Sequence, residues 1–317
     1  MRVLRALIKS RSGQIGESWR EVPLTGLQTG YFRAPRPLPV YAFGYWFGAI
    51  NYSTGGNNYL RIIRSADGIA WEFVADVFTA ATVPENFAAT FNDGTIMFGG
   101  RAGLSQGYVA LSQDGVNWNG AATAAASQIN SVAFENDVFL ASSSGNGLRR
   151  STDFATWATV SSTVTNVAGA NNIFVGMDAG LLANSTDGLT WSSVSALAGK
   201  SIGNVSFAGG RFWATTLDVA RQLWWSTDGS NWFQATVPPA FQNDSNPVYG
   251  MGYAAGLWFY AYAKQSAPST TGAMISSTGN VFQDVSGTNP AIVEVSFNGP
   301  FLRAAAGFNP QTAYFSP

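Results

Sequence analysis

The segment from Asn130 to Val160 alternates apolar and polar residues in four short runs separated by residues that favour turns. Alternation with a period of two is typical of strands with one buried face. The runs predict strands at about 131–134, 138–142, 148–151 and 156–160. An Asn-Asp pair, a Gly-rich stretch and a Ser-Thr-Asp stretch separate them, as expected for tight turns. The segment therefore predicts one four-stranded antiparallel unit.

The end of this unit carries a short motif, Ser-x-Asp-Gly-x-x-Trp, that recurs along the chain. Copies end at Trp71, Trp118, Trp157, Trp191 and Trp232, and a degenerate copy ends at Phe282. The Ser residues of successive copies are 47, 39, 34, 41 and 50 residues apart. The mean spacing, about 42 residues, is typical of a four-stranded propeller blade. We therefore predict an all-β fold, a β-propeller.

The two ends of the chain predict how the ring closes. The last unit, 291–317, stops before its fourth strand, and residues 17–24 hold the Trp-x-x-Val spacing of the other fourth strands. Pairing the two would cover an exposed sheet edge and place Trp19 near Phe315. We expect residues 17–317 to form seven blades, at about 40–76, 86–122, 130–160, 164–195, 203–237, 247–286, and 291–317 with 17–24.

Composition and charge narrow the chemistry. The 317 residues include no Cys and no His, which leaves no thiol nucleophile, no imidazole base and none of the usual zinc ligands. We expect no cofactor and no metal site. The formal net charge is −1, so no basic field favours nucleic acid. No eighteen-residue apolar run predicts membrane insertion, and the N-terminus is a poor signal peptide, so we expect no export by the general secretory route.

The Asp of each motif copy is interpreted as architectural. An Asp-Gly pair between alternating runs favours a hairpin, because Gly adopts a positive φ and the carboxylate accepts nearby backbone N–H groups. The motif Trp is expected to pack against the neighbouring blade. Phe154 replaces the Gly of one copy and Thr278 the Asp of another, which predicts looser turns there. The five carboxylates fall in different blades and are not expected to form one site: Asp67, Asp114, Asp153, Asp187 and Asp228.

These repeats resemble the Asp-box (BNR) repeats of sialidases, bacterial surface propellers and photosystem assembly factors. The usual pattern, Ser-x-Asp-x-Gly-x-x-Trp, is one residue longer, which implies a tighter turn here. With the low charge and the abundance of Gly, Asn and Ser, the chain also resembles bacteriophage tail, fibre and baseplate proteins with Ser-Thr-Asp-Gly-x-x-Trp repeats. That resemblance implies a non-enzymatic virion structural protein, made in the host cytoplasm, that binds host-surface polysaccharide or a neighbouring virion protein.

Binding is expected on the propeller face with the longer connections, which join strand two to strand three and each blade to the next. The expected loops are 51–59, 99–107, 216–222, 236–247 and 264–272, and they also contain Asn243 and Asp244. Their polar and aromatic content suits recognition of sugars or of a protein. The predicted binding residues are Tyr52, Asn57, Tyr59, Arg101, Gln106, Arg221, Lys264 and Gln265.

Residues 1–16 lie ahead of the ring and form a predicted docking arm. The arm carries four cations and no acid: Arg2, Arg5, Lys9 and Arg11. It is expected to contact other virion proteins by adding a strand or by meeting an acidic neighbour, and the alternative is a solvated terminus.

Two other functions are weighed against virion binding. The segment "YFRAP" resembles the Phe-Arg-Ile-Pro motif of sialidases, which would make Arg33 a carboxylate ligand in a glycan hydrolase. The segment from 34 to 56 contains no Asp or Glu to act as the acid, which argues against catalysis. The third possibility is a cellular assembly scaffold of the photosystem-assembly kind.

Overall fold

A computed structural model describes the chain at residues 20–23, 40–54, 57–67, 70–80, 84–102, 106–125, 127–143, 145–218, 220–242, 251–254, 257–263, 271–284, 292–298, 301–306 and 312–316. The fold is an all-β propeller. Helical structure in the described residues is confined to η1 (Ser195–Leu197) and α2 (Pro239–Gln242). No described helix is long and apolar enough to span a bilayer.

Six sheets, named blades 1 to 6 in chain order, each contain four consecutive antiparallel strands. Blade 1 comprises β2 (Val40–Ala42), β3 (Tyr45–Thr54), β4 (Asn57–Ser65) and β5 (Glu72–Ala80). Blade 2 comprises β6 (Pro84–Asn92), β7 (Thr95–Ala102), β8 (Gln106–Ser112) and β9 (Asn119–Ala122). Blade 3 comprises β10 (Ile129–Glu135), β11 (Val138–Ser143), β12 (Gly147–Ser151) and β13 (Ala158–Ser161).

Blades 4 to 6 repeat the arrangement. Blade 4 comprises β14 (Val164–Ala170), β15 (Ile173–Asp178), β16 (Leu181–Ser185) and β17 (Ser192–Ser193). Blade 5 comprises β18 (Ile202–Ala208), β19 (Arg211–Thr216), β20 (Leu223–Ser226) and β21 (Phe233–Ala235). Blade 6 comprises β22 (Met251–Ala254), β23 (Leu257–Ala263), β24 (Thr271–Ser276) and β25 (Gln283–Asp284).

A further sheet, named the closing sheet, joins the two ends of the chain. It contains β26 (Ile292–Asn298), β27 (Phe301–Ala306), β28 (Thr312–Ser316) and β1 (Arg20–Pro23), in the order β1-β28-β27-β26. β1 runs antiparallel to β28 with Arg20 opposite Phe315, so the predicted pairing of an N-terminal strand with the last strand is present. Trp19 lies outside the described residues.

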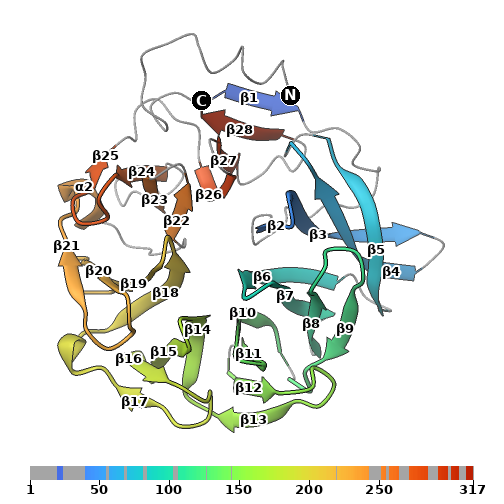
Figure 1. The fold of residues 1–317 in the computed structure, drawn as a ribbon, viewed down its shortest axis with the longest axis horizontal. Helices are drawn as coiled ribbons and strands as arrows, with labels where there is room; N and C mark the ends of the chain where they lie inside the picture. Colours follow the sequence, from blue (N-terminus) through green and yellow to red (C-terminus); the bar gives the residue numbers. More distant parts are fainter. Residues whose placement is uncertain are drawn as a thin grey trace.

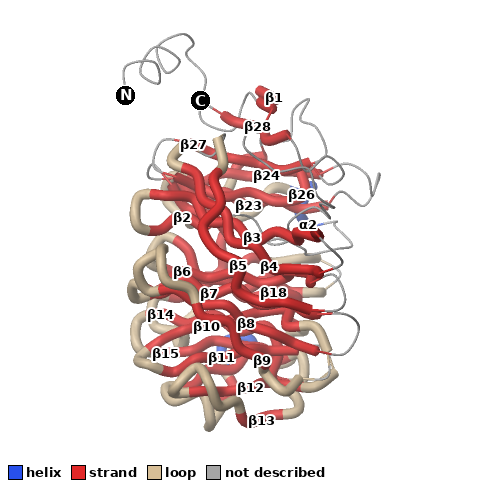
Figure 2. The backbone as a smooth tube through the Cα atoms, turned by 90° about the vertical axis from the view of Figure 1, so that its right-hand side faces the viewer, coloured by secondary structure: helices blue, strands red, loops and turns tan. Residues whose placement is uncertain are grey.

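The sheets surround a central axis, with the first strand of each blade innermost (Figure 1). Seen from the side, the strands of neighbouring blades stack in succession (Figure 2). The strands predicted between 131 and 160 are found in blade 3 with ends displaced by at most two residues. Local alternation therefore predicted these strands correctly.

The core lies between successive blades, and the motif Trp contributes to it. Trp157 of blade 3 packs in one buried cluster with Met97 and Leu111 of blade 2. Trp232 of blade 5 is likewise buried with Val175 of blade 4. The expectation that each motif Trp contacts the neighbouring blade is confirmed for these copies. Burying such a large ring contributes more stabilisation than most single side chains can.

Polar contacts also join the blades, on the side of the tight turns between first and second strands. The Glu135 carboxylate of blade 3 is 7% exposed and accepts from Asn92 Nδ2 of blade 2 at 2.5 Å. It also accepts from the backbone N of Asn172 in blade 4 at 2.8 Å. A buried carboxylate without partners would be costly, and these donors from both neighbours compensate it. Glu135 therefore aligns three blades.

Candidate functional site

The turns between the third and fourth strands, here called the Ser–Asp turns, are held by side-chain hydrogen bonds. In blade 2, Ser112 Oγ donates to Asp114 Oδ1 at 3.1 Å, and the Gly115 N donates to Ser112 Oγ at 2.9 Å. The N atoms of Val116 and Asn117 donate to Asp114 Oδ1 at 2.8 and 2.7 Å. The carboxylate thus replaces backbone acceptors in the turn, as predicted.

The same bonds set the pKa of these carboxyl groups. Hydrogen bonds from Val116 N, Asn117 N and the Asn117 side chain favour the charged form and lower the pKa of Asp114 to about 2. Backbone donors lower the pKa of Asp153 and Asp187 for the same reason. A carboxyl group with a lowered pKa is a poor general acid at neutral pH. These groups are therefore suited to architecture and not to proton transfer.

The two altered turns differ in outcome. Phe154 adopts φ of 60° in place of Gly, and the N atoms of Ala155 and Thr156 still donate to Asp153 Oδ1 at 2.9 and 2.7 Å. The expected loosening is limited to one bond: among the described residues, the bond from Gly N to Ser Oγ of the other copies has no counterpart at Phe154, while the bonds to Asp153 remain and the Phe154 ring packs edge-on against Phe139 at 5.5 Å. At Thr278 it is confirmed: the hydroxyl accepts from Asn280 N at 3.2 Å, longer than the carboxylate bonds.

The two faces of the propeller differ in their connections. The Ser–Asp turns and the tight turns between first and second strands share one face, here called the short-turn face. For example, Asn171 Nδ2 in the β14–β15 turn of blade 4 donates to the Thr227 carbonyl in the Ser–Asp turn of blade 5 at 3.2 Å. The opposite face, here called the long-loop face, carries the connections β3–β4, β7–β8 and β19–β20.

Two of the loops predicted on the long-loop face are mostly strand. β3 and β4 pair as far as Thr54 opposite Asn57, so Gly55 and Gly56 alone connect them. β7 and β8 pair as far as Ala102 opposite Gln106. The prediction of loops at 51–59 and 99–107 is wrong because most residues of both ranges pair as strand ends of the hairpins. A two-residue Gly-Gly connection is itself a hairpin signal.

The extended hairpin of blade 1 carries the first candidate site, here called the Arg61 cluster. The Arg61 guanidinium lies 3.5 Å from the centroid of the Tyr52 ring and 4.6 Å from that of Phe73. Its Nε and Nη2 donate to Asp76 Oδ1 and Oδ2 at 2.8 and 2.9 Å. The Tyr59 ring centroid lies 6.4 Å from that of Tyr52.

The Arg61 cluster is rigid and displays an apolar ring. The pair with Asp76 raises the pKa of Arg61, so the guanidinium is charged at any physiological pH. A two-point Arg–carboxylate pair fixes orientation as well as charge. Phe73 is 52% exposed although a large aromatic side chain is usually buried. The arrangement can therefore hold an aromatic surface in place for a partner.

The other predicted residues of blades 1 and 2 are placed less centrally. Asn57 begins β4 and Gln106 begins β8, and both are exposed. Arg101 lies near the end of β7 and is half-buried. Behind them Phe78 of blade 1 stacks on the buried Tyr108 of blade 2 with ring centroids 5.3 Å apart. This contact fixes the two hairpins relative to each other.

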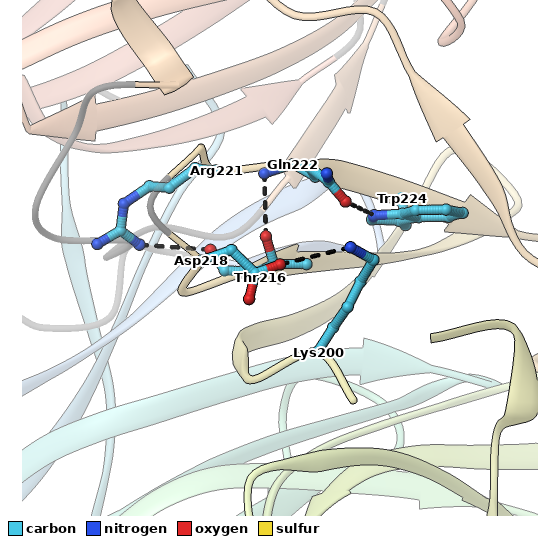
Figure 3. A network of polar contacts seen from close by, with 6 residues as sticks. All are labelled: Lys200, Thr216, Asp218, Arg221, Gln222 and Trp224. Carbon is cyan, nitrogen blue, oxygen red and sulfur yellow. Dashed lines mark hydrogen bonds and ion pairs between the residues drawn. The ribbon is translucent and has the colours of Figure 1, made fainter. Parts of the chain in front are cut away.

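Arg221 belongs to a second polar group on the long-loop face, in the β19–β20 connection of blade 5 (Figure 3). Its Nη1 donates to the Thr216 carbonyl at 3.4 Å, and the residue is only 6% exposed. Gln222 N donates to Thr216 Oγ1 at 3.0 Å, and Lys200 Nζ lies 3.5 Å from Asp218 Oδ2. Arg221 therefore supports the connection from inside and is not displayed on the surface.

The remaining predicted residues lie outside the described residues: Lys264, Gln265, Asn243, Asp244, Arg33, and the arm cations Arg2, Arg5, Lys9 and Arg11. Within the described ranges, no three Asp or Glu side chains gather closely enough to hold a metal ion.

Sequence reasoning missed Arg61, Phe73 and Asp76. They meet because β4 and β5 pair with register shifts between Leu60 and Arg61 and between Ile62 and Ile63, which set Arg61 opposite Asp76. The available signal was the run "EFVADVF", whose acids and aromatics alternate beside an Arg-containing strand.

Comparison with known proteins supports the fold. The family model described as the DUF6242 beta propeller domain matches residues 65–193. No curated protein sequence matches the chain.

Several solved structures share the architecture. A chain of the mitotic checkpoint complex is 10% identical with a TM-score of 0.60, and the alignment covers 97% of this chain and 98% of that one. YCF48 from Cyanidioschyzon merolae is 12% identical with a TM-score of 0.55, covering 94% and 98%. An ancestral GH74 enzyme is 12% identical with a TM-score of 0.51, covering 90% of this chain and 51% of that one. At these identities the likeness concerns the fold alone, and that fold is a β-propeller.

Proposed function

We propose that this chain is a non-enzymatic binding propeller that recognises host-surface polysaccharide through the two outer strands of blade 1, β4 and β5. The observation that carries the proposal is the Arg61 cluster, in which Phe73 remains 52% exposed beside a clamped guanidinium. The apolar face of a sugar ring can pack on an exposed aromatic ring and remove apolar area from water on both sides. Asn57 lies at the other end of β4, six residues from Ile63, the partner of Phe73, so it can donate hydrogen bonds only to more distant sugar units of the same polysaccharide.

Rigidity of the Arg61 cluster also supports binding. Tyr52 and Phe73 both lie against the guanidinium, and Asp76 fixes that guanidinium at two points. A partner therefore meets rings that are already ordered, and the entropy lost on binding is smaller than for mobile side chains.

The biological setting we propose is a bacteriophage tail, fibre or baseplate, so the protein would be located in the virion. The support is the resemblance of the Ser-Thr-Asp-Gly-x-x-Trp repeats and the low charge. In this proposal the arm, residues 1–16, contacts other virion proteins. Purified particles should contain the chain in a fixed ratio to the other tail proteins, and its absence from washed particles would contradict the assignment.

We also propose that the ring has seven blades of the Asp-box type, with the closing sheet as the last. The Ser–Asp turns and the pairing of β1 with β28 support this arrangement. Averaged electron micrographs of the ring viewed along its axis would count the blades.

A glycan array probed with the full chain tests the binding proposal. Wild-type protein should bind a defined set of polysaccharides, and Phe73→Ser should weaken binding at least about tenfold because it removes the exposed ring. Val116→Ser is a matched control, because Val116 is also exposed but lies in the Ser–Asp turn of blade 2, outside the Arg61 cluster. Equal loss in both variants, or binding unaffected by Phe73→Ser, would contradict the proposed site.

The same array distinguishes binding from hydrolysis. Sugar released with time from a bound glycan, and lost in Arg33→Ala, would identify a hydrolase and overturn the non-enzymatic assignment. Unchanged glycan after prolonged incubation supports a binding module.

A further inference from the structure

The seam between blades 5 and 6 contains a continuous stack of five side chains, here called the Arg211 ladder. The Arg211 guanidinium carbon lies 4.0 Å from the centroid of the Trp225 ring and 4.7 Å from that of Trp258. Phe233 extends the stack beyond Trp225 at 4.8 Å, and Tyr253 extends it beyond Trp258 at 4.6 Å. Cation–π attraction favours both indole contacts.

Two glycines make room for the ladder. A Cβ at Gly279 would lie 2.4 Å from Arg211 Nη1, and a Cβ at Gly209 would lie 2.6 Å from Trp258 Nε1. Either contact would force the guanidinium or the indole to move. The ladder therefore requires glycine at both positions, 209 and 279, in the turns beside it.

Blades 3 and 4 have an apolar residue at the position of Arg211, and the cation at the seam between them, Arg150, comes from a third strand. The residue that opens the second strand beside the next blade's Ser–Asp turn is Val138 in blade 3 and Ile173 in blade 4, whereas it is Arg211 in blade 5. The facing turn of blade 6 has Thr278 where the other turns have Asp. Compared with the seams of blades 3 and 4, this seam therefore has an additional cation, Arg211, and lacks the Asp carboxylate of the facing turn.

The charge of Arg211 is not balanced by a protein carboxylate within the described residues. The ion pairs there join Arg61 with Asp76, Arg64 with Glu72, and Lys200 with Asp218. Arg211 Nη1 instead donates to the neutral Asn280 Oδ1 at 3.3 Å. Partial burial without a carboxylate lowers the pKa of Arg211 below its usual value. By contrast, Arg61 is stacked on aromatic rings in the same way but is paired with Asp76.

We propose that the Arg211 ladder binds the carboxylate of an acidic sugar. Two indole rings lie against the Arg211 guanidinium, and its five N–H donors form a planar fork that matches a carboxylate. Phe233 and Tyr253 are 54% and 41% exposed and lie at the two ends of the ladder, where they offer aromatic surface to the sugar units next to the bound carboxylate. The site lies between blades 5 and 6 and the Arg61 cluster lies in blade 1, so the two sites share no residue.

The combination selects an acidic sugar over other anions. A free phosphate or a side-chain carboxylate would use the guanidinium alone and leave both exposed rings uncovered. A sugar acid uses both, because its carboxylate neutralises Arg211 and its ring covers apolar surface. The same pairing of charge and ring predicts that the methyl ester of the sugar binds poorly.

The test uses the full chain and trigalacturonate, with titration calorimetry and quenching of Trp fluorescence as independent readouts. Wild-type protein should bind trigalacturonate, and its methyl-esterified form should bind at least about tenfold more weakly, a difference of about 1.4 kcal/mol. Arg211→Gln should cause a similar loss, and Arg211→Lys a smaller one because the charge is kept without the planar fork. Arg61→Gln is the matched control and should leave trigalacturonate binding unchanged.

Phe233→Ser keeps the test informative if Arg211→Gln unfolds, because Phe233 is exposed and its loss should weaken binding without lowering the melting temperature. The proposal is overturned if the ester and the acid bind equally, if folded Arg211→Gln or Phe233→Ser binds like wild type, or if no saturable binding occurs. Equal affinity for tetraglutamate would identify the site as one for an acidic peptide instead.

Discussion

In the Ser–Asp turns of blades 2, 3 and 4, hydrogen bonds from the turn favour the charged form of the Asp carboxylate. In blade 2 the donors to Asp114 are two backbone N–H groups and the Asn117 amide. Hydrogen bonds to the charged form stabilise the folded state only while the carboxyl group is ionised. The contribution of these turns to stability therefore depends on pH.

Acid should weaken the turns in a defined window. The pKa of Asp114 falls from the ordinary 3.8 to about 2 on folding, so its stabilisation is complete above about pH 4 and disappears as the pH falls through about 2. The melting temperature of wild type should exceed that of Asp114→Asn at pH 6, and the difference should close between pH 4 and 2. A difference that stays constant over this range, measured by calorimetry, would contradict the assignment.

Glycine is required at position 115 both for its backbone dihedral angle and for the lack of room for a side chain. Its φ is +73°, and a Cβ there would lie 2.6 Å from Phe47 Cζ of blade 1. Gly115→Ala should lower the free energy of unfolding by about 2–3 kcal/mol, since positive φ alone costs about 1–2 kcal/mol. Gly94→Ala is the matched control, because Gly94 has φ of +68° with nothing within 4 Å of the added Cβ. Equal losses in urea denaturation would mean that the contact with Phe47 contributes nothing.

At the scale of the element, a blade is stable through its neighbour as much as through its own strands. β17 and β25 have two residues each, and β21 has three, so their ladders contribute few hydrogen bonds. The aromatic residue that precedes each of these strands, Trp191, Phe282 or Trp232, packs into a hydrophobic cluster instead. The fourth strand is held in place largely by that ring.

A substitution of Trp232 tests how much packing of the motif ring contributes to stability. It is buried in the cluster shared by blades 4 and 5, and its Nε1 donates to the Gly229 carbonyl at 3.0 Å. Trp232→Ala should lower the free energy of unfolding by about 3–5 kcal/mol, the usual range for removing a large buried aromatic. Leu189→Ser, an exposed apolar residue of another Ser–Asp turn, should stay within about 0.5 kcal/mol. A small loss for Trp232→Ala in urea denaturation would show that the seam repacks.

Features that depend on interactions between residues close in sequence were predictable, and features that depend on pairing of distant residues were not. The strands of blade 3 and the Ser–Asp turns follow from alternation and from Asp-Gly pairs, which act within a few residues. The Arg61 cluster depends on register shifts in the pairing of β4 with β5, and the Arg211 ladder depends on the alignment of two blades. Neither can be read from local pattern. Arg221 was predicted on the surface because it is a cation in a polar segment, but its burial depends on how the β19–β20 connection folds back.

At the scale of the whole molecule, the closing sheet joins the ends of the chain. β1 is separated from β28 by nearly the entire sequence, so their pairing carries the largest loop-closure entropy of any strand pair. Contacts between neighbouring residues do little to bring these two strands together. A covalent bond there should therefore stabilise the ring more than a bond within one blade.

An engineered disulfide tests the closure directly. The chain has no Cys, so Arg20→Cys with Phe315→Cys can form only one bond within the molecule. Because these residues are directly opposite in an antiparallel pair, the bond should form on oxidation and raise the melting temperature, with a chain-entropy gain of about 5 kcal/mol. Arg20→Cys with Tyr314→Cys is the matched control: successive side chains point to opposite faces of a sheet, so this pair should form the bond poorly.

Equal cross-linking of both pairs would mean that β1 slides along β28, while no cross-linking of either would mean that the ring is closed in another way. Reduction of the correct pair should return the melting temperature to the wild-type value, because only the linkage and not the substitutions stabilises the ring.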